Sequence, residues 1–498
     1  MCVISHRSET TDYKEKMVRD YERLSAQDSS FLWFEQRSTP MHVSAIAVFE
    51  VGPLATAGGG LDAEQITKHV ESRLHLLPLY RKRLAFAPID GQPVWVDDDR
   101  FELGYHVRRA ALPHPGSESV FKEWVGHTLS QRLDRERPLW ELWIVEGLEG
   151  GRFALVSKVH HCMIDGVSGM NLLTLLMSPS ADETTSPAPP WEPRPAPGPL
   201  RLLLDEAARR MGTLGAVASG VRDALRDPRA TWTQLTEGAA AIAQALEAGL
   251  RPPARTPLNS PIGPHRRVDW LTLDLAAAKA VKARLGGTVN DVVLATVAGG
   301  LHRFFGRREW RARLDYRILV PVNMRPPGDE RAGGNRVSAL FLSLPVEERN
   351  PLRRYARIRA ESERTKASRA AEGIDLFTRI TDWTGSTGLT AFGVRLASRL
   401  RPYNLIVTNV PGPQFPLYVL GARLVELYPQ VPLFAHQGLG VAVLSYCGRL
   451  HFGLTGDWEV ARDLGRLREA IGDAFAELVS AAAGAVPPAA RRASAVAR

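Results

Sequence analysis

A run of prolines divides this chain into two halves. Residues 178–199 hold eight prolines. Proline lacks a backbone N–H and its ring fixes φ, so neither a helix interior nor a central strand can be built from this run. The segment is therefore predicted to be an extended connector. We expect the chain before it and the chain after it each to form a separate hydrophobic core.

Both halves are long enough to fold, and both mix helical and strand-like patterns. The chain has 498 residues, of which 44% are hydrophobic and 23% charged, which excludes disorder for the bulk of it. The patterns predict α/β lobes at residues 21–177 and 266–485. Residues 178–265 are expected to form a proline-rich and helical crossover. A polar leader is predicted at 1–20 and a disordered tail at 486–498.

The pattern of the N-terminal half is clear enough to predict individual elements. Ser25 is expected to cap the first helix, because serine is a favoured residue at that position. Helices are predicted over Ala26–Gln36, Ala63–Leu76 and Glu123–Leu133, and strands over Met41–Val51, Trp143–Glu146 and Phe153–His161.

Charge and cysteine content restrict the partners and the compartment. The formal net charge is +9, which favours anionic partners such as phosphates or acidic lipids. Nucleic acid is not expected, since the basic residues are not interleaved with aromatic ones. Three cysteines do not make a disulfide framework, so we expect a reducing, cytoplasmic location. We find neither a signal peptide nor a run that could span a membrane, so any membrane contact is expected to be peripheral.

The most informative segment is RFALVSKVHHCMIDGVSGMNLLTLLM, residues 152–177. Side chains alternate in a strand, so His160 and His161 are expected to point in opposite directions, and only one should reach a given cavity. Asp165 then ends the strand and is expected to cap the next helix, near the two imidazoles. An imidazole has an ordinary pKa of about 6.5, which suits a general base at neutral pH.

Other interpretations of this segment remain open. The histidines could be satisfied core residues, or they could bind a metal. Metal binding needs a third ligand, and the spacing is not that of the HExxH zinc helices, so no metal is predicted. Residues 166–169 resemble a nucleophile elbow, but position 170 is methionine where that motif has glycine. Cys162 is interpreted as a small buried residue.

His160–Gly166 matches the HHxxxDG signature of the coenzyme A-dependent acyltransferase superfamily. Further matching segments are LSAQDSSFLWFE (24–35), PMHV (40–43), PLWE (138–141), LNSPIGPHRR (258–267), NDVVLA (290–295), PVNMR (321–325), GNRVS (334–338) and TNVPGP (408–413). With this ordered set, the chain resembles the bacterial wax ester synthase/diacylglycerol acyltransferase family, particularly its actinobacterial members. HHxxxDG alone is less specific, because peptide-synthetase condensation domains share it.

The resemblance implies a two-lobed α/β (α+β) fold like that of chloramphenicol acetyltransferase, with a central tunnel. It also implies that acyl-CoA enters from one side as a substrate and a lipid alcohol from the other, so no cofactor is expected. His161 matches the family's catalytic base, His160 and Asp165 complete the catalytic motif, and Gly166 is expected to contact substrate. The Pro411–Gly412–Pro413 turn is expected to support a crossover between the lobes.

The second lobe offers further candidates for substrate binding. Thr288 is predicted to cap a helix that has Asn290 and Asp291 in its first turn. The free N–H groups of a helix N-terminus suit a developing negative charge. The alternative that these two residues only complete the cap stays open. Arg325 is expected to shape the site or to pair with Asp165.

The activity implied by the resemblance is formation of triacylglycerol from diacylglycerol, of wax esters from long-chain alcohols, or of both. The acyl group would pass directly from coenzyme A, with His161 as general base, at a membrane or lipid-droplet surface. Two alternatives remain. A condensation-type acyltransferase would use a carrier-bound donor, although the chain contains no carrier-protein domain. A non-catalytic lipid-droplet protein would not need the intact histidines.

Overall fold

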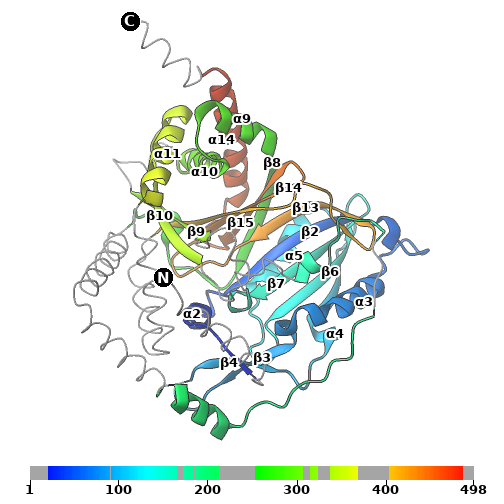
Figure 1. Cartoon of the computed structure of the whole chain (residues 1–498). Helices are drawn as coiled ribbons and strands as arrows, with labels where there is room; N and C mark the ends of the chain where they lie inside the picture. The colour runs from blue at the N-terminus through cyan, green and yellow to red at the C-terminus, as the bar shows by residue number, and fades with distance from the viewer. Residues whose placement is uncertain are drawn as a thin grey trace, which may run out of the picture.

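The computed structural model is described over residues 21–89, 91–164, 172–182, 187–209, 211, 253–306, 315–323, 337–367 and 403–485. Within these ranges the strands form two six-stranded sheets and one three-stranded sheet. Each large sheet is the centre of one lobe, and the two lobes lie one above the other in Figure 1. The structure therefore has the two-lobed α/β architecture that the sequence predicts.

The sheet of the N-terminal lobe is mixed. Its strands lie in the order β12 (Tyr418–Val419), β13 (Ala422–Gln430), β2 (His42–Glu50), β7 (Arg152–His160), β6 (Trp140–Leu148) and β5 (Val107–Ala111). Its helices are α2 (Ala26–Phe34), α3 (Ala63–Arg73), α4 (Leu103–His106), α5 (Glu118–Ser130) and α6 (Leu172–Leu175), with 3₁₀ turns η1 (Gly52–Leu54), η2 (Leu74–Leu76), η3 (Pro78–Arg81) and η4 (His161–Met163).

Strand β7 lies in the interior of this sheet and is buried on both faces. Phe153 and Leu155 join the hydrophobic core that includes residues of α3, whereas Ala154 and Val156 join the core that includes α5. This alternation is the predicted one, because successive side chains of a strand point to opposite faces. The end of β7, where the two histidines lie, is therefore fixed by packing from both sides.

A small sheet completes the N-terminal lobe. It has the order β1 (Tyr21–Arg23), β4 (Pro93–Asp97), β3 (Lys82–Phe86). The helical segment 199–209 packs against it, with Leu202 in the shared core and Glu206 paired with Arg23. This segment follows the proline-rich connector, so the connector leads the chain back onto the N-terminal lobe.

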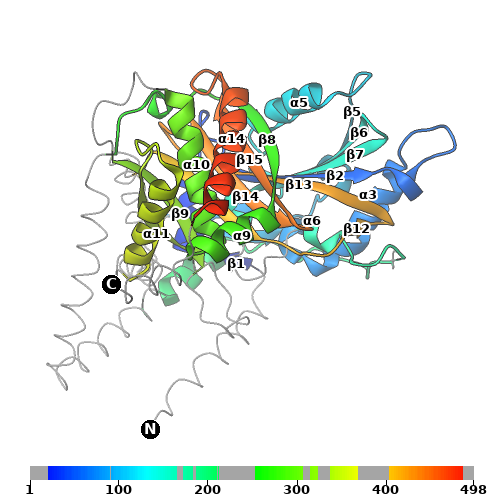
Figure 2. The ribbon, with the colours of Figure 1, turned by 90° about the horizontal axis from the view of Figure 1, so that it is seen from above.

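The sheet of the C-terminal lobe is covered by helices. Its order is β10 (Val337–Leu344), β9 (Tyr316–Asn323), β11 (Leu405–Pro411), β14 (Leu439–Tyr446), β15 (Arg449–Asp457) and β8 (Arg266–Asp274). The helices are α9 (Leu275–Leu285), α10 (Val289–Phe305), α11 (Pro351–Ala367) and α14 (Leu464–Ala483), preceded by the turn η5 (Pro257–Asn259). Figure 2 shows these helices gathered over this lobe, away from α3 and α5.

The two lobes exchange strands. The chain leaves the C-terminal sheet after β11, forms β12 and β13 in the N-terminal sheet, and returns as β14 (Figures 1 and 2). The predicted Pro411–Gly412–Pro413 turn lies where the chain leaves. β13 pairs antiparallel with β2 and so covers an edge that would otherwise present unpaired backbone groups. The predicted C-terminal segment, residues 266–485, thus supplies strands to both sheets. The predicted lobe boundaries did not include this exchange.

Helix α5 of the N-terminal lobe also contacts the C-terminal lobe, at strand β8. Phe121 of α5 contacts the ring of Trp270 on β8 edge to face, at 5.6 Å between ring centroids. The N–H of Arg266, the first residue of β8, donates to Ser130 Oγ at 2.8 Å. These contacts join the helix that covers the N-terminal sheet to an edge strand of the C-terminal sheet.

The predicted elements of the N-terminal half occur, with different ends. Ser25 caps α2 as predicted, its Oγ accepting from the Asp28 N–H at 3.0 Å. Helix α5 begins at Glu118, five residues before the predicted start, because Phe121 extends its buried side. Strand β7 ends at His160, and His161 opens the turn η4. The predicted leader, the tail and residues 212–252 of the crossover lie outside the described residues. No helix within the described ranges is long and apolar enough to cross a membrane.

Candidate active site

The histidine pair stands where β7 passes into η4. The His160 N–H donates to the Leu139 carbonyl at 2.9 Å, and the His161 N–H donates to the Met41 carbonyl at 2.8 Å. Leu139 and Met41 are both fully buried. The backbone of both histidines is therefore held by the segments that lead into the two neighbouring strands, β6 and β2.

The ring of His160 is buried and its tautomer is determined by its neighbours. Its Nδ1 accepts from the Cys162 N–H at 3.2 Å and lies 2.9 Å from the Cys162 Sγ. Because Nδ1 accepts a backbone hydrogen bond, Nε2 carries the hydrogen in the neutral ring. Nε2 faces the carboxylate of Glu35, with 3.6 Å between Nε2 and Oε1. Nδ1 accepts from the backbone and Nε2 lies beside a carboxylate, so this ring suits a supporting position behind its neighbour.

His161 is the histidine that remains partly open. Its ring stacks on Phe31 of α2, with 3.8 Å between ring centroids and 17° between planes. Its Nδ1 is buried and has no hydrogen-bond partner among the described residues. The residue as a whole is partly exposed, whereas His160 is buried.

The electrostatic environment keeps His161 neutral. Burial lowers the pKa of His161 to about 4; its own backbone carbonyl acts against this shift, and the neighbouring His160 acts with it. Burial disfavours the charged imidazolium, since that form loses its hydration. At neutral pH the ring is therefore unprotonated and able to accept a proton.

An ion pair between buried Glu35 and partly exposed Arg135, which the sequence did not predict, lies beside the histidines. The Glu35 side chain is 1% exposed, and its Oε2 accepts from Arg135 Nε at 2.9 Å. Burial alone would raise the pKa of Glu35, but His160 and Arg135 outweigh it and lower the pKa to about 2. Glu35 ends the segment LSAQDSSFLWFE, whereas Arg135 lies 100 residues further on. Spacing therefore gave no signal for the pair.

In the second lobe, the predicted capping of α10 is present. Thr288 Oγ1 accepts from the Asp291 N–H at 3.2 Å, and Asp291 Oδ2 accepts from the Thr288 N–H at 2.8 Å. One carboxylate oxygen of Asp291 is therefore used by the cap, as the alternative interpretation anticipated. Asn290 instead accepts from Asn409 of β11, at 3.4 Å between Oδ1 and Nδ2. Asn409 lies in the TNVPGP segment and was not predicted as a site residue.

The predicted site residues that the structure describes form two pairs, one in each lobe. His160 and His161 are adjacent, whereas Asn290 and Asp291 lie at the start of α10 in the other lobe, and within the described residues no hydrogen bond or ion pair joins the two sets. Predicted roles for Asp165, Gly166 and Arg325 lie outside the described residues.

Comparisons with known proteins bear directly on this arrangement. The family model described as the wax ester synthase/diacylglycerol acyltransferase catalytic domain matches residues 24–293, and the WS/DGAT C-terminal domain matches residues 333–479. The first match includes both histidines and the start of α10. The chain belongs to the wax ester synthase/diacylglycerol acyltransferase family.

Relatives and solved structures agree with this family membership. A Mycobacterium tuberculosis protein named probable diacylglycerol O-acyltransferase tgs1 is 34% identical over 463 residues, covering 92% of this chain and 96% of the relative. The wax ester synthase/diacylglycerol acyltransferase structure from Marinobacter aquaeolei is 29% identical, covers 93% of this chain and 100% of its own, and has a TM-score of 0.66. The family prediction made from the motifs is confirmed.

The fold is also that of condensation domains. The starter condensation domain of rhizomide synthetase RzmA, solved in complex with C8-CoA and Leu-SNAC, aligns with a TM-score of 0.53 and 14% identity, covering 97% of this chain and 98% of its own. At that identity the likeness concerns the fold alone.

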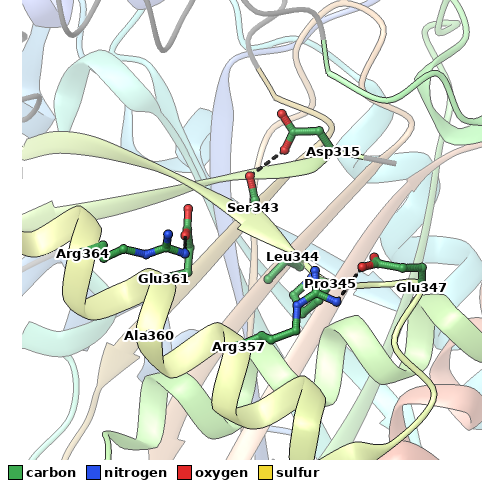
Figure 3. Close-up of a pocket in the computed structure, with 9 residues that line it drawn as sticks. All are labelled: Asp315, Ser343, Leu344, Pro345, Glu347, Arg357, Ala360, Glu361 and Arg364. Carbon is green, nitrogen blue, oxygen red and sulfur yellow. Dashed lines mark hydrogen bonds and ion pairs between the residues drawn. The ribbon is translucent and has the colours of Figure 1, made fainter. Parts of the chain in front are cut away.

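A surface cavity of about 630 Å³ lies apart from the family motifs, between β10 and α11 (Figure 3). Four of its charged side chains form two ion pairs with one another: Arg357 with Glu347 at 2.7 Å, and Arg364 with Glu361. Neither predicted histidine lines it. Within the described ranges, no group of three or more histidine, cysteine, aspartate or glutamate side chains is arranged to hold a metal ion.

Proposed function

We propose that this chain transfers a fatty acyl group from coenzyme A to the hydroxyl of a lipid alcohol, with His161 as general base. Nε2 of His161 takes the hydroxyl proton, and the oxygen attacks the thioester carbonyl to give a tetrahedral oxyanion. Collapse of this intermediate breaks the C–S bond and expels the thiolate, which receives the proton from His161. The products are an ester and free coenzyme A, and the reaction needs no cofactor.

The observation that carries the proposal is the position of His161, whose neutral imidazole lies at the end of β7 within the HHxxxDG segment and belongs to a partly exposed residue. General base catalysis contributes about 10²- to 10⁴-fold. Relatives supply the substrate classes: one is named a diacylglycerol acyltransferase, and the other a wax ester synthase/diacylglycerol acyltransferase. We therefore propose diacylglycerol, long-chain alcohols or both as acceptors, giving triacylglycerol or wax esters.

We propose the N-terminus of α10 as the place where the oxyanion is stabilised. The helix begins at Val289, and the N–H groups of its first turn, which includes Asn290, point out of the end of the helix. A helix N-terminus carries a partial positive charge, which favours a developing negative charge. The Asn409 amide, held against Asn290, supplies a further donor in the same region. Asp165, Gly166 and Arg325 remain proposed members of the site.

The decisive experiment is a product profile. The purified protein is incubated with palmitoyl-CoA and diolein, hexadecanol or a short alcohol, and free thiol release is followed together with the ester product. We expect thiol release that depends on a lipid alcohol. A parallel reaction with a palmitoyl-acyl carrier protein tests the condensation-type alternative. Failure of every acceptor with both donors would leave the non-catalytic alternative.

The pH profile gives a second test of the base. Protonation of His161 removes the base, so kcat/KM falls as the pH falls through the pKa of the ring. That pKa is lowered to about 4, so we expect kcat/KM to hold between pH 8 and about pH 5. An ordinary histidine would lose half its activity near pH 6.5. Circular dichroism at each pH separates loss of the base from unfolding, and an acid limb near 6.5 in folded protein would contradict the assignment.

We further propose that the protein works from the cytoplasmic side, peripherally, on a membrane or lipid droplet. The support is a set of exposed apolar residues, with Leu200 and Leu204 on the helical segment 199–209 and Met211 just beyond it, which are between 62% and 70% exposed. We expect sedimentation with vesicles of phosphatidylcholine and phosphatidylglycerol, and weaker sedimentation for Leu204→Glu. The same change at Leu76, an exposed leucine on η2, is the matched control and should have no effect. Equal binding of all three proteins would refute the role of these residues.

A further inference from the structure

The C-terminal end of α2 contacts both histidines. Phe31 lies against the ring of His161, and Glu35, which caps the helix, lies against the ring of His160. We propose that Glu35, held by Arg135, is a positioning residue that fixes the orientation of the histidine pair for acyl transfer. This inference rests on the proposed function of His161 and assigns a role to the segment LSAQDSSFLWFE.

Two short routes lead from Glu35 to the backbone of His161. In the first, Glu35 faces Nε2 of His160, whose Nδ1 accepts from the Cys162 N–H and so caps the turn η4 that opens with His161. In the second, Glu35 Oε1 accepts from the Met41 N–H at 3.3 Å, and the Met41 carbonyl accepts from the His161 N–H at 2.8 Å. One carboxylate therefore restrains both the turn and the strand end.

The negative charge of Glu35 is required by what surrounds it. Oε2 accepts from Arg135 Nε at 2.9 Å, and Oε1 meets the Met41 N–H and the Nε2 of His160. Every one of these partners is a donor, and only a carboxylate accepts on both oxygens. A glutamine at this position would turn its NH₂ group either toward the guanidinium or toward the other donors. The shape would be kept and the restraint would be lost.

Arg135 fixes Glu35 to the rest of α2. Its second terminal nitrogen donates to the Leu32 carbonyl at 2.8 Å, while Nε donates to Glu35. An arginine bound to a carboxylate and a helix carbonyl together holds a defined geometry, because its donors lie in one plane. The end of α2, the ion pair and the histidine turn thus form a single rigid unit.

The neighbouring thiol does not supply another explanation for this cluster. Cys162, His160 and Glu35 lie in the order of a cysteine–histidine–carboxylate triad. However, Cys162 is 3% exposed, and burial raises the pKa of its thiol. The thiolate is the reactive form, so a buried thiol of raised pKa is a poor nucleophile. The cluster is therefore assigned to positioning.

The test compares Glu35→Gln with Glu35→Asp in the full-length protein. If Glu35 only filled space, Glu35→Gln should lose less activity than Glu35→Asp, because glutamine matches the size of glutamate. If the charge of Glu35 positions the histidines, Glu35→Gln should lose more activity than Glu35→Asp. We expect Glu35→Gln to lower kcat about 10- to 100-fold with little change in the KM for palmitoyl-CoA. Glu35→Asp should retain more of the activity.

Glu477→Gln is the matched control, because Glu477 on α14 also pairs with two arginines, Arg303 at 3.3 Å and Arg354 at 3.5 Å, but lies in the other lobe. Its kcat should not change. Unchanged kcat in Glu35→Gln, or Glu35→Gln more active than Glu35→Asp, would overturn the inference.

A second readout does not depend on turnover. Hydrogen–deuterium exchange of the peptide covering residues 153–164 reports the His161 N–H that donates to Met41. Glu35→Gln should speed exchange in this peptide and leave peptides of α14 unchanged. If the wild-type protein esterified no alcohol, the proposed function would fail. The exchange measurement would still test whether Glu35 restrains the backbone at His161. Unchanged exchange in folded Glu35→Gln would overturn the positioning role.

Discussion

Replacing His161 with alanine is expected to lower kcat by about 10²- to 10⁴-fold while the protein stays folded. The imidazole is the group that takes the hydroxyl proton, and the adjacent His160 is poorly placed to replace it, since its ring is 1% exposed, its Nδ1 accepts from the Cys162 N–H and its Nε2 faces Glu35. The loss should appear in kcat and in kcat/KM together, because the removed interaction belongs to the transition state. Thiol release from palmitoyl-CoA with diolein or hexadecanol measures it.

The matched control for this change is His75→Ala, because His75 is an exposed histidine on η2 in the same lobe. Its kcat should equal that of the wild type. Removing the His161 ring also frees one face of Phe31, so thermal unfolding must be compared for both variants. A folded His161→Ala protein with wild-type turnover would exclude His161 as the base and leave the reaction without an assigned proton acceptor.

Local patterns in the sequence predicted much of the fold and pointed to the histidine pair of the candidate site. The serine cap before Ala26, the alternation along Phe153–His160 and the cap at Thr288 each depend on residues close together in the chain. Such features follow from backbone geometry and near-neighbour hydrogen bonds. The histidines could be identified for the same reason, because their motif is contiguous.

What the sequence could not predict depends on partners far apart in the chain. Glu35 meets Arg135 and His160 across 100 and 125 positions, and nothing in the spacing marks them as neighbours. The transfer of β13 into the N-terminal sheet is of the same kind, since a strand's own residues do not specify which edge it will pair with. Periodicity gives the buried face of a strand, whereas the partner depends on the whole assembly.

The exchanged strand leads to a second large expected effect, at Gly453. This residue lies on β15 of the C-terminal sheet, where β13 of the N-terminal sheet crosses close by. A Cβ atom at position 453 would lie 1.7 Å from the Pro429 carbonyl oxygen and 2.9 Å from Gln430 Nε2. The first of these atoms belongs to the backbone, so a side-chain rotation cannot relieve the overlap.

Gly453→Ala is therefore expected to force β13 and β15 apart and to lower the free energy of unfolding by about 3 kcal/mol. The midpoint of thermal unfolding should fall by several degrees. Acyl transfer should fall too, because β13 pairs directly with β2, and Met41, the residue before β2, accepts from the His161 N–H. Differential scanning calorimetry and the thiol assay measure the two effects.

Gly472→Ala is the control, because it is expected to raise the free energy of unfolding where Gly453→Ala lowers it. Gly472 lies within α14, and a Cβ there meets nothing closer than Leu271 Cδ1 at 3.9 Å. Alanine is the better helix former, so this variant should gain about 0.5–1 kcal/mol. The same chemical change would then destabilise at the crossing of the two sheets and stabilise on a helix. If Gly453→Ala had the same midpoint of thermal unfolding as the wild type, the close contact between β13 and β15 would not contribute to holding the lobes together.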